Sequence, residues 1–187
     1  MVLFVGRFVA AKNFFLWVEV AERIAAAVPE ARFLMVGDGP LRDAVAARVA
    51  KSGIADRFEL PGAVPHDRLG TAYAASDVFL LTSNHEGFGR VLAEAFLARV
   101  PVVSTACAGP HDIVIDGENG FLCPVGDRDV LAECVVRPLR DRDMARSFAR
   151  RGRERLRREF DERRLVAEMA ACWVRLAGGR AEPECGT

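Results

Sequence analysis

The sequence lacks an excess of charge of either sign, and it lacks a long apolar run. Its 187 residues carry 26 basic and 26 acidic side chains, so the overall charge does not favour nucleic acid as a partner. The longest apolar run near the start covers residues 14–18, which is far too short to cross a bilayer, and Glu19, Glu22 and Arg23 follow it. Neither a signal peptide nor a membrane span is therefore expected, and any anion-binding chemistry must be local.

Paired cysteines and metal-ligand spacing are also lacking. The cysteines are odd in number and none forms a C-x-x-C pair; they are Cys107, Cys123, Cys134, Cys172 and Cys185. None of the three histidines has the spacing of a metal ligand. The pattern favours reduced cysteines in a cytoplasmic protein without a metal site.

About half of the residues are apolar, and they form short strand-like runs that alternate with helical ones. The predicted strands are residues 2–5, 33–36, 57–60, 78–81, 102–104 and 121–123. The predicted helices are residues 14–28, 41–50, 66–75 and 91–98, then a helical region beyond residue 127 that ends in an amphipathic helix at 165–176.

The predicted strands are continuously apolar, which is typical of a sheet with helices on both faces. Strand–helix alternation predicts an α/β fold with a doubly wound, Rossmann-like parallel sheet of about six strands. We expect one domain over residues 1–177 and a disordered tail at 178–187. Ligands of such sheets bind at the carboxyl ends of the strands, and the unusual residues of this chain lie there.

Two cations follow the first predicted strand. Gly6, Arg7 and Phe8 come directly after it, and Lys12 lies five residues beyond Arg7. A guanidinium and an ammonium in a loop between a strand and a helix suit a diphosphate. An ordinary basic loop is the alternative.

Two glycines follow the second predicted strand, in the stretch Val36-Gly37-Asp38-Gly39-Pro40. They would let the backbone approach a ligand closely. A dinucleotide-binding fingerprint would have a third glycine where Arg42 stands, which disfavours a nicotinamide cofactor. A tight strand–helix turn explains the glycines equally well.

The most specific stretch covers residues 83–95, where a glycine-rich loop leads from a strand into a helix. The free amides at such a helix start form an anion site, and Glu86 in the loop can face its ligand. The helix is apolar on nearly every side, so we expect it to be buried. Glu94 on that helix then needs hydrogen-bond donors, from either a core salt bridge or a ligand's vicinal hydroxyls.

Glu86 and Glu94, with seven residues between them that begin with a Gly-Phe-Gly loop, resemble the paired-glutamate motif of retaining glycosyltransferases with the GT-B architecture. The resemblance is to the large bacterial group 1 family, with its polysaccharide and lipopolysaccharide transferases and the sucrose and glycogen synthases. It extends to about residue 129 in the family's order, through Gly6-Arg7 with Lys12, residues 36–40, Gly62, residues 75–78, 101–103 and 117–121.

This resemblance implies a hexose-type donor sugar on a nucleoside diphosphate, UDP or GDP, and no metal or other cofactor. Arg7 and Lys12 would hold the diphosphate and stabilise it as it leaves, and Glu86 would bind the donor sugar. Glu94 would accept hydrogen bonds from the ribose hydroxyls. The catalytic residues would thus be Arg7, Lys12 and Glu86. The donor-binding residues would be Gly6, Gly37, Gly39, Gly62, Val64, Gly87, Phe88, Gly89, Val91, Leu92 and Glu94, those at 62–64 beside the base.

GT-B enzymes have two such domains, and the resemblance places this chain in the C-terminal one. We therefore expect a missing N-terminal domain to supply the acceptor site, with a glycan or lipid-linked acceptor in cell-surface polysaccharide synthesis. The chain alone would be inactive, and the whole enzyme could bind a membrane peripherally. The alternatives are a stand-alone binding or scaffold module that recruits a separate N-terminal subunit, and half of a nucleotide-sugar epimerase, against which the paired glutamates argue.

Three positions depart from the family pattern. Arg99 stands after the glutamate helix, where glycine is frequent, which puts the geometry of that turn in doubt. In the loop at residues 108–112, Asp112 follows His111 where the family has a glutamate. Arg90 stands in place of an apolar residue, either as an extra cation or as a solvated side chain.

Overall fold

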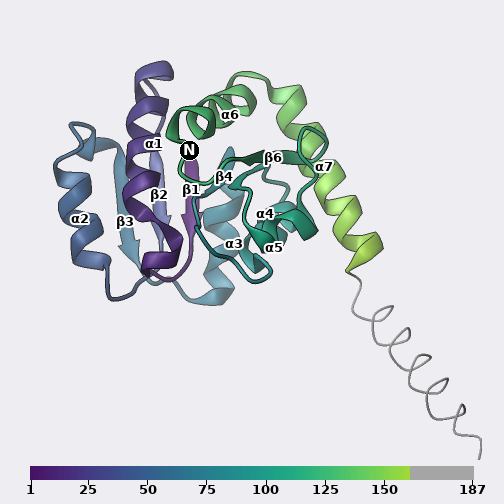
Figure 1. Cartoon of the computed structure of the whole chain (residues 1–187), viewed down its shortest axis with the longest axis horizontal. Helices are drawn as coiled ribbons and strands as arrows, with labels where there is room; N and C mark the ends of the chain where they lie inside the picture. The colour runs from purple at the N-terminus through teal and green to yellow at the C-terminus, as the bar shows by residue number, and fades with distance from the viewer. Residues whose placement is uncertain (161–187) are drawn as a thin grey trace, which may run out of the picture.

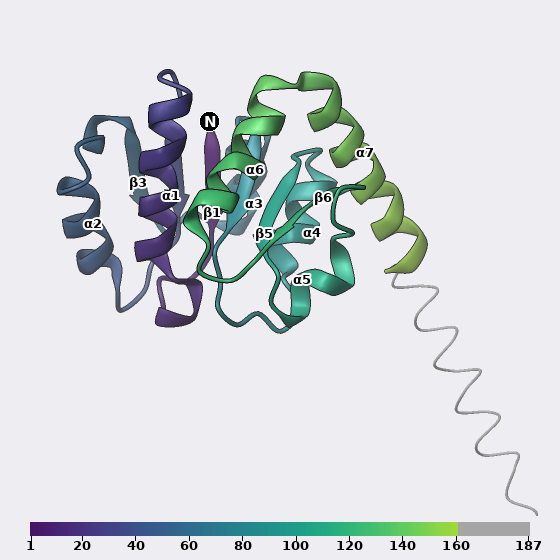
Figure 2. The ribbon, with the colours of Figure 1, turned by 45° about the horizontal axis from the view of Figure 1, so that its top comes forward.

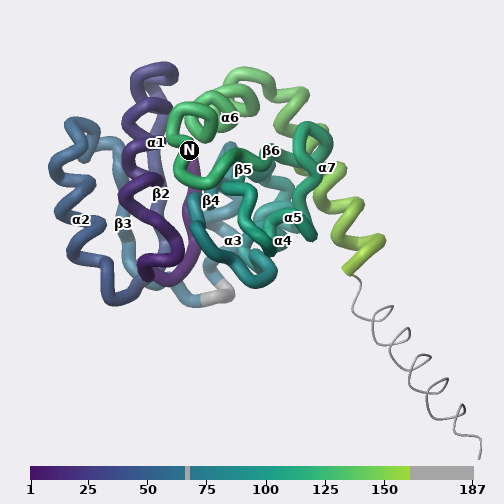
Figure 3. The backbone as a smooth tube through the Cα atoms, in the orientation of Figure 1, coloured from purple at the N-terminus to yellow at the C-terminus, as the bar shows by residue number. Residues whose placement is uncertain are grey.

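Six parallel strands form one sheet in a computed structural model that describes residues 1–160, apart from the side chains of residues 66 and 67 (grey in Figure 3). The order across the sheet is β3-β2-β1-β4-β5-β6. Their bounds are β1 Val2–Val5, β2 Phe33–Val36, β3 Phe58–Gly62, β4 Val78–Leu81, β5 Val102–Thr105 and β6 Gly120–Cys123. This confirms the predicted doubly wound, Rossmann-like sheet. The helix predicted at 165–176 and the tail at 178–187 lie outside the described residues.

Helices cover both faces of the sheet (Figures 1 and 2). Helices α1, α2 and α6 pack side by side on one face, and α3 and α4 lie on the other, where α7 packs along α4. The helices are α1 Phe14–Ala27, α2 Arg42–Ala50, α3 His66–Ala74, α4 Arg90–Leu97, α5 Ala108–Ile113, α6 Arg128–Arg140 and α7 Arg142–Glu159, with single 3-10 turns at Ala10–Lys12 and Ala55–Arg57.

The structure corrects two sequence predictions. Strand β3, an edge strand that pairs only with β2, alternates in exposure along Phe58–Gly62, because Glu59 and Pro61 face solvent. Residues 108–112, predicted as a loop, form most of the short helix α5. The fully buried strands β1, β4 and β5 are continuously apolar up to their carboxyl ends, as predicted.

The loops that leave β1 and β2 are joined by main-chain hydrogen bonds. The Gly6 amide donates to the Val36 carbonyl at 3.0 Å, and the Phe8 amide donates to the Asp38 carbonyl at 2.9 Å. A β-carbon on Gly37 would lie 1.8 Å from the Gly6 oxygen, at a φ of +144°. The two loops can therefore approach this closely only because Gly37 has no side chain.

Aromatic packing in the core anchors the loop after β1. Phe8 is 1% exposed, and its ring centroid lies 4.6 Å from that of Phe14 at the start of α1. Phe14 in turn meets the ring of Phe4 on β1 edge-on at 4.9 Å. Asn13, in the left-handed conformation, caps α1 by accepting from the Leu16 amide at 3.3 Å. The chain is thus fixed on both sides of Arg7 and Lys12.

The turn after α4 keeps a glycine-like geometry without glycine. Arg99 has a φ of +64°, which costs an L-residue about 1 kcal/mol. The departure at Arg99 therefore leaves the backbone of the turn unchanged and adds a guanidinium on its surface.

The contact at Gly37 makes a stability prediction. Gly37→Ala is expected to lower the free energy of unfolding by about 2–4 kcal/mol, because the added methyl group overlaps the Gly6 carbonyl. Gly53 is the matched control, since it also has a positive φ, +73°, but open space around it. Gly53→Ala should cost about 1 kcal/mol. Equal losses in urea unfolding would contradict a role for the loop contact.

Candidate functional site

The loop after β1 also meets the loop after β4, at the point where the strand order reverses. The Thr82 hydroxyl donates to the carbonyl oxygens of Lys12 and Asn13, at 3.0 and 3.2 Å. The Asn84 amide donates to the Ala11 carbonyl at 2.8 Å. Both loops lie at the carboxyl ends of the strands, the lower edge in Figure 1, which is where ligands of such sheets bind.

Lys12 and Glu86 form an ion pair across these two loops. Each side chain is only 16% exposed, so neither is an ordinary solvated surface group. The sequence placed both in the site but gave no sign that they contact one another. The pair holds one cation and one carboxylate together at the switch point, where each can exchange its partner for a ligand group.

Arg7 lines an open hollow of about 380 Å³, and Lys12 is not among the residues that line it. Arg7 is exposed, and its side chain makes no hydrogen bond or ion pair within the described part of the chain. Gly62 ends β3 below the hollow, where its carbonyl accepts from the Gly37 amide at 2.9 Å. The hollow is lined by Val5, Gly6, Arg7, Val36, Gly37, Asp38, Ala63, Val64 and Leu69.

Gly39, the second glycine after β2, lies against the same loop. A β-carbon there would lie 2.5 Å from the Phe8 carbonyl oxygen. Of the residues predicted for the donor site, Gly6, Gly37 and Val64 line the hollow directly, whereas Gly39 and Gly62 shape its walls.

The glycine loop after β4 leads into α4 through Gly89, whose φ is +84°. The Leu92 amide donates to the Gly89 carbonyl at 2.8 Å, so it is already occupied. The Leu92 side chain is fully buried as well. The Val91 amide has no acceptor among residues 1–160 and remains open at the helix start. Phe88 is 39% exposed, with its ring centroid 5.3 Å from that of Phe160.

Helix α5 supports this loop from behind, a contact that the sequence did not reveal. The Gly109 amide donates to the Glu86 carbonyl at 3.0 Å. A β-carbon on Gly109 would lie 2.7 Å from the Gly87 oxygen, so the close approach requires glycine. Gly109 therefore fixes the backbone that carries Glu86, and the Gly109-Pro110 pair was the available signal.

Glu94 receives a hydrogen bond from Tyr73 on α3. The Tyr73 hydroxyl lies 2.9 Å from Glu94 Oε2 and 3.4 Å from the Val91 carbonyl oxygen. No core salt bridge to Glu94 is present in the described residues, so the donor is a neutral hydroxyl. Glu94 Oε1 has no partner there and stays available to accept from a ligand.

Helix α4 is less buried than its sequence suggested. Leu92, Ala95 and Phe96 face the core, but Leu97 is 53% exposed and Glu94 is only partly buried. The prediction of an all-round buried helix was wrong because Leu97 points to solvent. Glu94 can thus be reached by a ligand while Tyr73, at 3% exposure, holds it from the protein side.

The other positions that depart from the family pattern carry exposed side chains. Arg90 is exposed at the start of α4, as expected for a solvated side chain. His111 and Asp112 are exposed on α5, and Asp112 offers only its carbonyl oxygen, to Arg155 at 3.1 Å.

Within residues 1–160, no three His, Cys, Asp or Glu side chains are grouped as metal ligands would be. The helices described there include none with the length and apolar character needed to cross a membrane.

A doubly wound parallel sheet, with a cation–carboxylate pair and glycine loops at its switch point, defines a Rossmann-like α/β domain. The chain belongs to the glycosyl transferases of group 1, whose family model matches residues 1–155. The lipopolysaccharide core biosynthesis glycosyltransferase LpsE of Rhizobium meliloti is 32% identical over 166 residues, 89% of this chain and 47% of LpsE.

Two solved structures share the fold. The Anabaena protein HepE, determined with UDP and glucose, superposes with a TM-score of 0.83 at 24% identity, covering 92% of this chain and 47% of HepE. The C-terminal domain of a group 1 glycosyl transferase, LpcC of Francisella tularensis, gives 0.76 at 20% identity, over 86% of this chain and 85% of that one. The chain spans less than half the length of the curated relatives it matches.

The Tyr73–Glu94 contact predicts an unusual titration. Burial, and then the charge of Glu94, raise the pKa of Tyr73. Tyr73 is the only tyrosine in the chain, so the near-ultraviolet absorbance of tyrosinate reports it alone. Folded protein should show no tyrosinate signal at pH values near 10, where urea-unfolded protein ionises normally.

The raised pKa also sets the sign of a stability change. The contribution of Tyr73 is fully present below its unfolded-state pKa of about 10 and is lost as the pH rises toward the folded-state pKa. Above pH of about 10 the wild type should therefore lose stability relative to Tyr73→Phe. Ionisation of Tyr73 near that pH in protein that is still folded would rule out the buried contact.

Proposed function

We propose that this chain is the donor-binding half of a retaining glycosyltransferase. The enzyme would transfer a hexose-type sugar from a UDP- or GDP-linked donor to a glycan or lipid-linked acceptor, in polysaccharide biosynthesis. The observation that carries the proposal is the meeting of Lys12 with Glu86 at the switch point, flanked by Arg7 in its hollow and by Glu94 on α4.

The cations fit a leaving diphosphate. As the bond between the anomeric carbon and the diphosphate oxygen breaks, negative charge develops on that oxygen. The Arg7 side chain has no partner among residues 1–160, and Lys12 can turn from Glu86 to phosphate, so both can stabilise this charge. The open Val91 amide at the start of α4 adds a third donor.

The carboxylates fit hydroxyl groups of the same donor. When Lys12 binds phosphate, Glu86 is released to accept from the sugar, beside the exposed backbone of Gly87 and Phe88. Glu94 has one oxygen held by Tyr73 and the other unoccupied, which suits the vicinal hydroxyls of a ribose. Val64, beside the hollow, would flank the base.

We also propose that the transfer step uses no metal ion or other cofactor, because Arg7 and Lys12 supply the positive charge. The acceptor site would come from an N-terminal domain, in keeping with relatives of which this chain covers less than half. The scattered free cysteines support a cytoplasmic location. Peripheral membrane association of the whole enzyme remains part of the proposal.

Calorimetric titration with UDP, GDP and ADP tests the donor site. Glu94→Gln should weaken UDP binding by about ten- to a hundred-fold, because a charged acceptor of ribose hydroxyls is lost. The affinity for 2′,3′-dideoxyuridine diphosphate, which lacks those hydroxyls, should not change. Glu133→Gln, at an exposed position of α6, is the control for the charge change. Equal effects of Glu94→Gln on both nucleotides would refute the ribose assignment.

Arg7→Gln separates phosphate recognition from base recognition. It should weaken UDP binding by about tenfold and leave the affinity for uridine unchanged, because only UDP carries the diphosphate. If the folded protein binds none of UDP, GDP and ADP, the donor-site proposal fails for this chain. Sugar transfer by the chain without a partner domain would refute the half-enzyme proposal and would also exclude the scaffold alternative.

A further inference from the structure

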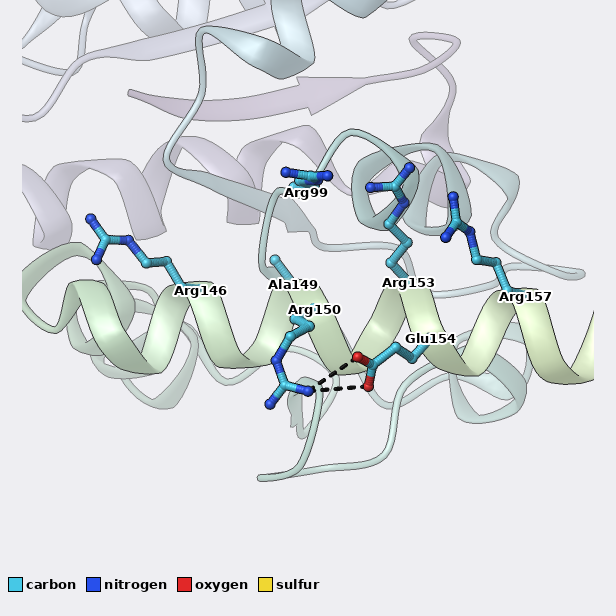
Figure 4. Close-up of a pocket in the computed structure, with 7 residues that line it drawn as sticks. All are labelled: Arg99, Arg146, Ala149, Arg150, Arg153, Glu154 and Arg157. Atoms are coloured by element: carbon cyan, nitrogen blue, oxygen red, sulfur yellow. Dashed lines mark hydrogen bonds and ion pairs between the residues drawn. The ribbon is translucent and has the colours of Figure 1, made fainter.

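A groove rich in arginine runs along α7, beside the turn after α4 (Figure 4). It has a volume of about 450 Å³, and five of its side chains are cationic against one carboxylate. Helix α7 carries eight arginines and three acidic residues, although the whole chain has no net charge. The groove is lined by Arg99, Arg146, Ala149, Arg150, Arg153, Glu154 and Arg157.

Three of these arginines have no anionic partner. Arg150 pairs with Glu154 at 3.1 Å, and the two point away from the others (Figure 4). Within the described residues, the side chains of Arg99, Arg153 and Arg157 make no ion pair and no hydrogen bond, and Figure 4 shows them gathered on one side of α7. The Nε of Arg153 is buried there without an acceptor. A buried donor without an acceptor is rare in folded proteins, and a bound water or an anion would satisfy it.

Arg99 adopts a left-handed backbone conformation that is unfavourable for any residue except glycine. Its φ of +64° is one that glycine adopts more readily, yet an arginine stands here. The charge of Arg157, with smaller effects of burial and of Arg99, lowers the pKa of Arg153. The guanidinium groups therefore repel one another across the groove, and an anion between them would relieve the repulsion.

We propose that this groove is a second anion site, which binds a ligand carrying two or more phosphate groups. Guanidinium groups suit phosphate because their planar fork donates two parallel hydrogen bonds. The groove lies at the end of α4 opposite Gly89, so it is separate from Arg7 and Lys12. The phosphates could belong to a soluble compound or to clustered phospholipid headgroups, and the proposal does not depend on the donor site.

The test is an NMR titration of the full chain with tripolyphosphate, and in parallel a sedimentation assay with phosphatidylglycerol vesicles and phosphatidylcholine vesicles as the neutral control. Tripolyphosphate should shift the amide signals of residues 99 and 146–157. Signals of residues 6–12 report the proposed donor site separately. Sedimentation with phosphatidylglycerol vesicles but not with phosphatidylcholine vesicles would identify headgroups as the source of the phosphates. Tripolyphosphate shifts without such sedimentation would identify a soluble ligand.

Arg99→Gly is the sharpest variant, because glycine suits the backbone conformation at this turn and the fold is expected to persist. It should weaken binding by about fivefold or more, as should Arg153→Gln. Arg151→Gln is the matched control, because it also removes one positive charge. Arg151 lies on α7 outside the groove, and its side chain donates to the Glu118 carbonyl.

Binding of either probe that is lost in Arg99→Gly but retained in Arg151→Gln supports the site. Equal weakening by these two variants would reduce the effect to overall charge and overturn the proposal. Absence of binding by both tripolyphosphate and phosphatidylglycerol vesicles would overturn it as well.

Discussion

The close main-chain contact between the loops after β1 and β2 is the constraint on which the candidate site depends. Gly37 and Gly39 lie against the backbone of Gly6 and Phe8 at distances that exclude any side chain. Hydrogen bonds from Gly6 to Val36 and from Gly37 to Gly62 continue the contact across three strands. A loop held this firmly can present Arg7 and Lys12 in fixed positions, which reduces the ordering required when an anion binds.

The loop after β4 and helix α4, on the other side of the site, are also held in place by hydrogen bonds and close backbone contacts. The loop that carries Glu86 is held by Thr82 and Asn84 on one side and by Gly109 on the other. Glu94 is held by Tyr73 from within the protein. The acidic and basic groups are therefore positioned by a supporting layer of hydroxyls, amides and glycines. The Lys12–Glu86 ion pair compensates two partly buried charges until ligand groups replace each partner.

The sequence predicted the sheet well because its strands are buried on both faces and read as continuous apolar runs. It also placed Arg7, Lys12, Glu86 and Glu94 near the carboxyl ends of the strands, since that position follows from topology alone. Strand β3 was harder, because Glu59 and Pro61 interrupt its apolar residues and face solvent. Helix α5 has only six residues and contains Gly109 and Pro110, so it offers too little periodicity to be distinguished from a loop.

Side-chain partnerships were beyond the sequence because they join residues far apart in the chain. Lys12 and Glu86 are 74 positions apart, and Tyr73 and Glu94 lie on different helices. The occupied Leu92 amide and the left-handed Arg99 depend on local dihedral angles that several sequences could adopt. The sequence likewise did not predict the arginine groove, because Arg99 and the arginines of α7 come together only through the packing of α7 against α4.

The central claim is that a nucleoside diphosphate binds between the loop after β1 and the start of α4. A crystal structure of the chain with UDP tests it most directly. We expect the diphosphate to contact Arg7 and Lys12, the ribose to lie on Glu94, and the Lys12–Glu86 pair to be opened. A nucleotide bound elsewhere, or bound here with the Lys12–Glu86 pair intact, would contradict the account.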